Sequence, residues 1–136
     1  MKVRIKRLND LAVIPSYAKE GDAGMDMVAI GFETKGNYVT YKTGIALEIP
    51  QGFVGLLFPR SSVYKKEQTL SNSVGVIDSG YRGEVMFKYT LSENMYQVGD
   101  RVGQLIIMPY PKISFEVVSD LSDTDRGTGG YGSTGN

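Results

Sequence analysis

The 136-residue chain contains no cysteine and no histidine. Without cysteine it has no disulfide, no thiolate nucleophile and no thiolate metal site, which fits a reducing compartment, so we expect a cytoplasmic protein. Without histidine it lacks the commonest general base near neutral pH, and proton abstraction would fall to a carboxylate, a lysine or a tyrosine. These two absences narrow the chemistry that an active site here could use.

Net charge and long apolar runs are missing as well. Fifteen basic residues balance fifteen acidic ones, so no global positive charge favours direct nucleic acid binding, and any affinity for phosphate must be local. No apolar stretch approaches the roughly 20 residues that span a bilayer. Residues 1–8 alternate charged and apolar side chains, which predicts a strand rather than an export signal. We therefore expect a soluble protein with no membrane partner.

Helical periodicity is scarce, whereas strand-like segments are frequent. Short runs of β-branched and aromatic residues cover 44–49, 53–58 and 104–108, with turn residues between such segments. Only residues 61–66 have the pattern of a helical turn, which a serine could cap. A chain of this length forms one ordinary domain. We predict an all-β domain over residues 1–121, a distorted jelly-roll-like barrel or sandwich.

The C-terminal residues 122–136 lose the apolar pattern. They contain five glycines, Gly127, Gly129, Gly130, Gly132 and Gly135. Such a composition is typical of a flexible tail, so we predict a mobile arm. A phosphate-binding P-loop is excluded, because the lysine and the following helix of that motif are absent.

A strand followed by a tight turn stands out in the middle of the chain. Residues 73–77 have strand character, Asp78 follows, Ser79 and Gly80 turn the chain, and Tyr81 is predicted to begin a second strand. This pattern predicts a β-hairpin. Backbone groups along a hairpin can read the edge of a base, and Asp78 is the candidate general base. The alternative is that Asp78 is a turn aspartate that caps the hairpin.

Three other segments combine polar side chains with turns or strand ends. Residues 22–27 place an aspartate beside a glycine, which alone is usually a turn. Residues 58–62 end an apolar strand in an arginine and two serines, groups that bind phosphate oxygens but also occur in ordinary surface turns. Residues 101–104 lead into the predicted strand 104–108 through a glycine and a glutamine. Singly, each pattern is ambiguous.

Taken with their flanking residues, these segments and the C-terminal glycine-rich one resemble the five ordered motifs of the trimeric dUTPase family over nearly the whole chain. The five matching segments are residues 22–27, 58–62, 72–84, 100–104 and 126–135. The resemblance implies a jelly-roll-like homotrimer with active sites shared between subunits. It also implies Mg²⁺-dependent hydrolysis of dUTP to dUMP and pyrophosphate, by attack of water at the α-phosphorus. Such an activity limits uracil in DNA and supplies dUMP for dTMP synthesis. One difference is Tyr131, where the family usually has phenylalanine, although the aromatic ring is kept.

The resemblance also implies roles for individual residues. Asp26 would hold Mg²⁺ through a water, Asp78 would be the base, and Gln104 would contact the α-phosphate and the attacking water. Ser61 would steady the leaving pyrophosphate. The implied substrate contacts are Arg60, Ser61 and Ser62 for the triphosphate; Asn72, Gly75, Val76, Ile77, Asp78 and Tyr81 around uracil and sugar; Gln104; and Arg126, Tyr131, Gly132, Ser133 and Thr134 in the closing arm. The implied division puts the first, second and fourth motifs on one subunit, the hairpin on another and the arm on a third.

Two rival functions are compatible with these residues. A dCTP deaminase of the same superfamily would need a glutamate base beside the cytosine and lacks this set of five motifs. A nucleotide-responsive binding protein would keep the site while acting through a partner. Ammonia release from dCTP would identify the first, and capture of a partner in one nucleotide state without turnover would identify the second.

Overall fold

The computed structural model describes residues 1–135, and within this range strands make up nearly all of the regular structure. The one helix among the described residues, η1 (Ser61–Lys66), is short and of the 3-10 type. The strands are β1 (Arg4–Arg7), β2 (Met25–Val28), β3 (Gly31–Lys35), β4 (Tyr38–Lys42), β5 (Ile45–Glu48), β6 (Phe53–Phe58), β7 (Gly75–Ile77), β8 (Met86–Thr90) and β9 (Arg101–Pro109). The predicted all-β, jelly-roll-like class is confirmed.

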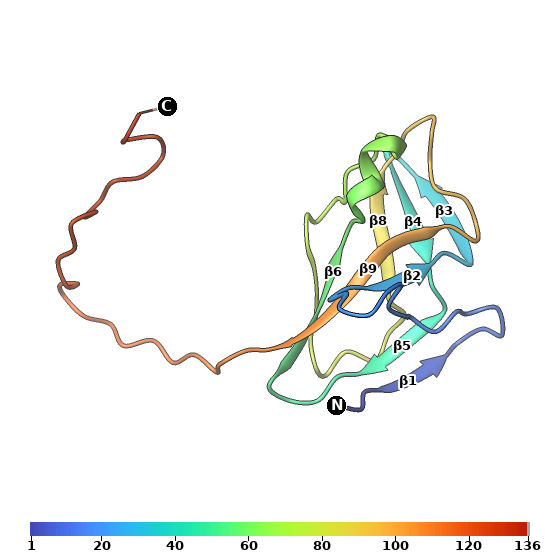
Figure 1. The fold of residues 1–136 in the computed structure, drawn as a ribbon, viewed down its shortest axis with the longest axis horizontal. Coiled ribbons are helices and arrows are strands. Elements are labelled where there is room, and N and C mark those ends of the chain that lie inside the picture. The colour runs from blue at the N-terminus through green and yellow to red at the C-terminus, as the bar shows by residue number, and fades with distance from the viewer. Residues whose placement is uncertain (136) are drawn as a thin grey trace.

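Over residues 1–135 the strands form three antiparallel sheets. The largest has the order β2-β9-β6-β7, the second has the order β3-β4-β8, and β1 pairs with β5 in the third. Figure 1 shows the sheets gathered in one body, with the N-terminal pair β1 and β5 at one end. Each sheet joins segments that are distant in the chain, so the register is set by long-range pairing.

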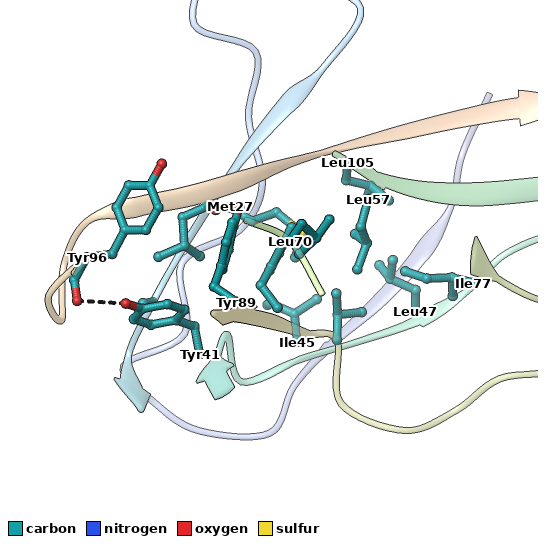
Figure 2. Close-up of a cluster of buried hydrophobic side chains, with 14 of the residues drawn as sticks. Met27, Tyr41, Ile45, Leu47, Leu57, Leu70, Ile77, Tyr89, Tyr96 and Leu105 are labelled. Atoms are coloured by element: carbon teal, nitrogen blue, oxygen red, sulfur yellow. Dashed lines mark hydrogen bonds between the residues drawn. The ribbon is translucent and has the colours of Figure 1, made fainter. Parts of the chain in front are cut away.

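The core is formed by side chains that alternate along the strands (Figure 2). In β4, for example, Val39 and Tyr41 are fully buried while their neighbours are only partly covered, as expected for a strand with one face on a core. The Tyr41 hydroxyl donates a hydrogen bond to the Tyr96 carbonyl at 3.1 Å, and the Tyr89 hydroxyl donates to the Val102 carbonyl at 2.6 Å. The aromatic core is therefore also fixed by polar contacts.

The expected N-terminal strand is present as β1, and the helical turn at 61–66 is confirmed as η1. The predicted serine cap is wrong. The capping position is Arg60, which makes no side-chain cap hydrogen bond. Because the arginine side chain is instead paired with Asp26 on a different strand, tertiary contacts replace the local cap here.

The predicted hairpin after residue 73 is also wrong. Strand β7 pairs with β6, whereas the next strand, β8, begins at Met86 and pairs with β4 in the other sheet. Tyr81 lies in the connecting loop, and the Val85 N–H donates to the Ile45 carbonyl at 2.8 Å, which leads the chain into the other sheet. A strand, a turn and a second apolar segment look alike in sequence whether the two strands pair or separate. β7 is instead an edge strand.

Beyond Pro109 the chain leaves the body and runs as an extended arm (Figure 1). Continuous exposure begins at Met108, at the end of β9 and ahead of the glycine-rich segment that starts at residue 122. The side chains of Phe115 and Val117 are 92% and 97% exposed. Residue 136, the last of the predicted arm, lies outside the described residues, and the division at 121 and 122 stays a prediction. Across residues 1–135 no helix has the length and apolar character to cross a membrane.

Candidate functional site

A cavity of about 390 Å³ opens beside the edge strand β7. Its wall includes six of the predicted substrate-contacting residues, Asn72, Gly75, Val76, Ile77, Asp78 and Tyr81. On β7, Gly75 and Ile77 are buried while Val76 is 63% exposed. Because β7 pairs only with β6 among the strands of residues 1–135, its other edge leaves backbone donors and acceptors for a ligand.

The loop after β7 is held by hydrogen bonds within itself. The Tyr81 N–H donates to the Asp78 carbonyl at 3.0 Å, and the Tyr81 hydroxyl donates to the Glu84 carbonyl at 3.0 Å. The Arg82 guanidinium donates to the carbonyls of Ser79, at 2.6 Å, and Tyr81, at 3.1 Å. These contacts hold the loop in one shape, with Asp78 and Tyr81 at the cavity wall.

Asn72 is placed by a tight turn directly before β7. The Val74 N–H donates to the Asn72 carbonyl at 2.6 Å, and Ser73 between them has a φ of 60°. A positive φ is uncommon for a residue with a side chain and is concentrated near functional sites. The sequence did not predict this conformation of Ser73.

A second cluster lies across the large sheet. Asp26 on β2 is the partner of Gln104 on β9, which is in turn the partner of Phe58 at the end of β6. The Asp26 carboxylate, with a side chain 16% exposed, accepts from Arg60 Nε at 3.1 Å and from Arg101 at 3.2 Å. Three predicted residues from distant segments, Asp26, Arg60 and Gln104, are thus brought together by strand register.

Gln104 is fixed on two sides. Its side-chain amide donates to the Pro59 carbonyl at 3.1 Å, next to Arg60. On the other side lies Gly24, where a built Cβ would come within 2.9 Å of Gln104 Cδ and closer still to Oε1. The first motif therefore has a glycine at position 24 because the Gln104 amide occupies the space that a side chain there would need.

Next to this cluster is a polar depression of about 340 Å³. Its lining consists of Arg60, Ser62, Lys65, Lys66, Tyr96, Gly99, Asp100 and Arg101. Four of these residues are cationic, so the depression supplies the local positive charge that phosphate binding requires. Lys66 Nζ lies 5.4 Å from the centre of the Tyr96 ring. Ser61 is exposed at the start of η1, beside this depression.

Tyr96 connects this depression to the core. Its backbone carbonyl accepts from Tyr41, while its hydroxyl points away from Tyr41 (Figure 2) and has no hydrogen-bond partner within residues 1–135. Burial raises the pKa of the Tyr96 hydroxyl, nearby Arg60 lowers it, and Asp100 raises it further. The hydroxyl therefore remains neutral over the ordinary pH range.

The predicted arm residues lie away from both clusters in the single chain (Figure 1). Arg126 Nε donates to the Gly129 carbonyl at 2.8 Å, and the Ser133 N–H donates to the Gly130 carbonyl at 3.0 Å, so the arm contacts mainly itself. Tyr131 is fully exposed. The fold brings together residues of the first, second and fourth segments at one cluster and those of the third segment at the separate cavity beside β7, whereas Arg126, Tyr131, Gly132, Ser133 and Thr134 join neither.

The carboxylate of Asp26 is the acidic group best placed for the implied Mg²⁺. Both of its oxygens already accept from arginines, which disfavours direct metal binding but leaves lone pairs for a water of the hydration shell. Within residues 1–135 no three acidic residues gather into a metal-binding group. Mg²⁺ keeps several waters and is commonly held by one carboxylate and substrate phosphates, so the residues fit a water-mediated ion.

The structure adds residues that the sequence did not single out as site residues. Ser71, Glu84, Met86 and Lys88 line the cavity, and Lys65, Lys66, Tyr96 and Arg101 surround the depression. Lys88 and Met86 belong to β8, in the other sheet, so only the packing of two sheets brings them here. Lys65 and Lys66 could have been predicted from the sequence, because they follow Arg60 closely. Cations near a phosphate-binding residue add to the positive electrostatic potential there.

Comparison with known proteins agrees with this arrangement. The dUTPase family model matches residues 10–135. Deoxyuridine 5'-triphosphate nucleotidohydrolases of Picosynechococcus sp. and Clostridioides difficile are 40% and 38% identical to the chain; the matches cover 99% of both chains in the first case, and 98% of this chain and 97% of the relative in the second.

Solved structures show the same fold. The Staphylococcus bacteriophage 80alpha dUTPase with dUpNHpp has a TM-score of 0.85 at 25% identity, with 99% of each chain covered. A dUTPase mutant from phage phi11 of S. aureus, in which the coordination of a structural Mg(II) ion is described, has a TM-score of 0.76 at 24% identity, over 90% of this chain and all of that one. On the family match and the identities to these relatives, the chain belongs to the dUTPase family.

Proposed function

We propose that this protein hydrolyses dUTP to dUMP and pyrophosphate by attack of water at the α-phosphorus. The observation that carries the proposal is the cavity at the free edge of β7, where backbone groups, Asn72, Tyr81 and the Asp78 carboxylate share one wall. The names of the relatives agree with this activity. Such an enzyme limits uracil in DNA and supplies dUMP for dTMP synthesis. Because a DNA precursor is used inside the cell, we also propose a cytoplasmic location.

The base would bind at β7. Uracil presents one donor and two acceptors on its edge, and a free strand edge offers the complementary groups. Cytosine carries an amine where uracil has an acceptor, so it would leave buried groups unpaired and bind more weakly. With the base at Val76 and the α-phosphorus near Asp78, the sugar that joins them lies beside Tyr81.

The triphosphate would bind where charge and donors converge. Arg60 offers paired donors, Ser61 and Ser62 offer hydroxyls, and the Gln104 amide lies against the end of β6. Ser61 would steady the leaving pyrophosphate. Asp26 would hold Mg²⁺ through a water, and the bound ion would neutralise phosphate charge.

Asp78 would act on the attacking water. As a carboxylate it would accept the proton that the water loses, while Gln104 of a neighbouring subunit would orient the same water. Positioning and electrostatics, rather than covalent chemistry, account for most catalysis of this kind. No covalent intermediate on the protein is required.

A homotrimer would complete the site. In one chain the arm lies away from both clusters, and apolar side chains after Pro109 are uncovered. Closed threefold symmetry would let the β7 segment of a second subunit and the arm of a third reach the Asp26, Arg60 and Gln104 cluster of the first. There Arg126 would bind the γ-phosphate, Tyr131 would stack on the base, and the backbone and hydroxyls of Gly132, Ser133 and Thr134 would wrap phosphate oxygens as a lid.

The test is pyrophosphate release from dUTP with Mg²⁺, comparing the wild type with Asp78→Asn. The variant keeps the shape of the side chain but cannot take the proton, so we expect a loss of about 10²- to 10⁴-fold in turnover. Asp10→Asn, an exposed site outside both clusters, is the matched control. A wild type that binds dUTP without turnover would instead support the nucleotide-responsive binding protein.

The deaminase rival has one structural point in its favour, because Glu84 lies in the cavity wall. Its carboxylate, however, already accepts from the Gly44 N–H at 2.8 Å, which ties the loop to the start of β5. We therefore assign Glu84 an anchoring role. Ammonia release from dCTP by the wild type would overturn this assignment.

A further inference from the structure

Tyr81 rests on Gly83, two residues further along the chain. A Cβ built on Gly83 would lie 2.6 Å from Tyr81 Cζ and 2.9 Å from Cε2, and closer still to the hydroxyl oxygen. Real Cβ atoms do not approach other atoms so closely, because repulsion rises steeply below van der Waals contact. The ring of Tyr81 therefore occupies the space that any side chain at position 83 would need.

The requirement for glycine at position 83 comes from space and not from backbone conformation. Gly83 does not have a positive φ, so alanine could adopt the same backbone. Gly80, in the same loop, also has an ordinary φ, but a Cβ there would meet nothing within 4 Å. Of these two glycines, only Gly83 has another side chain, that of Tyr81, in the space that a Cβ would take.

The backbone around Tyr81 is fixed at several points, whereas one hydrogen bond holds the ring. Its hydroxyl donates to the Glu84 carbonyl, and the backbone carbonyl of Tyr81 accepts from Arg82 at 3.1 Å. The segment after the ring is tied to the other sheet by the Glu84 carboxylate on the Gly44 N–H and by Val85 on Ile45. An added methyl group at position 83 would therefore displace the ring rather than the backbone.

We infer that Gly83 is a positioning residue that sets the depth of the Tyr81 ring in the cavity and thereby the preference for deoxyribose over ribose. This inference rests on the proposed function, which places the sugar beside Tyr81. A ring held at one depth packs on a deoxyribose and leaves no room for a 2′-hydroxyl. When the ring moves, deoxynucleotides lose a packing contact that ribonucleotides do not make. The difference in affinity between deoxynucleotides and ribonucleotides therefore falls.

The experiment measures binding of dUMP and UMP by calorimetry and hydrolysis of dUTP and UTP, in Gly83→Ala and Gly80→Ala. We expect Gly83→Ala to weaken dUMP binding about tenfold and to reduce the preference for dUMP over UMP, because a small displacement of a packing group is enough for such a loss. The KM for dUTP should rise more than kcat falls. Gly80→Ala should resemble the wild type in every measurement.

A double-mutant cycle shows whether Gly83 acts through the ring. In a Tyr81→Ala background the space above residue 83 is empty, so adding Gly83→Ala should change neither affinity nor sugar preference further. Should Gly83→Ala alone fail to fold, recovery of folding in the double variant would support the clash. Tyr81→Phe, which frees the ring from the Glu84 carbonyl, should then lower the preference in the same direction.

Separate outcomes overturn the two levels of the inference. A wild type that prefers dUMP, with Gly83→Ala indistinguishable from Gly80→Ala, removes the role of Gly83 and leaves the proposed function intact. Equal effects of Gly83→Ala with and without the Tyr81 ring remove it as well. A wild type that neither binds dUMP nor hydrolyses dUTP removes the proposed function, and the inference with it.

Discussion

The α-carbon of Gly24 lies against the side-chain amide of Gln104, with no room for a Cβ between them. The two residues are 80 positions apart and meet because β2 and β9 are neighbours in the large sheet. Gly24 has no positive φ, so its backbone alone does not call for glycine. The glycine of the first motif and the glutamine of the fourth are thus one structural unit.

We predict that Gly24→Ala lowers kcat/KM for dUTP by about 10²-fold, because a displacement of the Gln104 amide by about 1 Å misplaces the attacking water. Pyrophosphate release measures the effect, and circular dichroism checks the fold. Gly31→Ala is the control, since a Cβ at Gly31 meets nothing within 4 Å and its φ is ordinary. Full activity in Gly24→Ala would contradict the proposed role of Gln104.

Asp26 is predicted to have both a structural and a metal-binding role. In Asp26→Asn, Arg60 and Arg101 lose a charged acceptor, so the free energy of unfolding should fall by about 1–2 kcal/mol, partly offset by solvent at Arg101. The Mg²⁺ concentration for half-maximal activity should rise. Urea unfolding without Mg²⁺ and a Mg²⁺ titration of turnover separate the two effects.

Glu33→Gln, the control, removes an exposed ion pair with Lys42. It should change neither the free energy of unfolding nor the Mg²⁺ concentration for half-maximal activity. An unchanged Mg²⁺ requirement in Asp26→Asn would exclude the metal-binding role and leave Asp26 only its structural role as the partner of the two arginines.

Tyr96→Phe is predicted to leave stability unchanged at pH 7 or to raise it by about 1 kcal/mol, because it removes a buried hydroxyl without a partner. Burial raises the pKa of Tyr96 above its ordinary value of 10.0. The unfolded chain therefore loses this proton at lower pH than the folded one, and stability that is full below about pH 10 is lost as the pH rises.

The stability of Tyr96→Phe relative to the wild type should accordingly grow between pH 9 and pH 11. Both proteins should still lose some stability at high pH, because burial also raises the pKa values of Tyr41 and Tyr89. Denaturant midpoints across this range provide the measurement. Tyr17→Phe, at an exposed tyrosine, is the comparison. A stability difference that does not change with pH would refute the assigned linkage.

A chain that ends at Asp125 should fold normally but hydrolyse dUTP at least about 10²-fold more slowly, since the described contacts of residues 126–135 lie within the arm while the lid would be lost. Thermal unfolding and pyrophosphate release test the two statements. In the intact chain Tyr131→Phe keeps the ring and should keep activity, whereas Tyr131→Ala should not. Wild-type turnover in the truncated chain would exclude a lid function.

The sequence by itself determined the features that depend on neighbouring residues. Alternating side chains and frequent turns were sufficient for the all-β class, for strands at 45–48 and 53–58, and for the helical turn at 61–66, because strand and turn preferences are local. The order of the five motifs was sufficient for the family. Asp26, Arg60, Asp78 and Gln104 could be named as candidate site residues before their arrangement was known.

Only the tertiary structure decided which strands pair and what each glycine faces. The sequence pattern around Asp78 predicted a hairpin, yet β7 pairs with β6 and β8 pairs with β4, because hydrogen-bond register depends on partners far along the chain. The Asp26–Arg60 ion pair and the contacts of Gly24 and Gly83 likewise arise from packing in three dimensions. Steric exclusion between segments that meet only on folding leaves no periodic signal in a sequence.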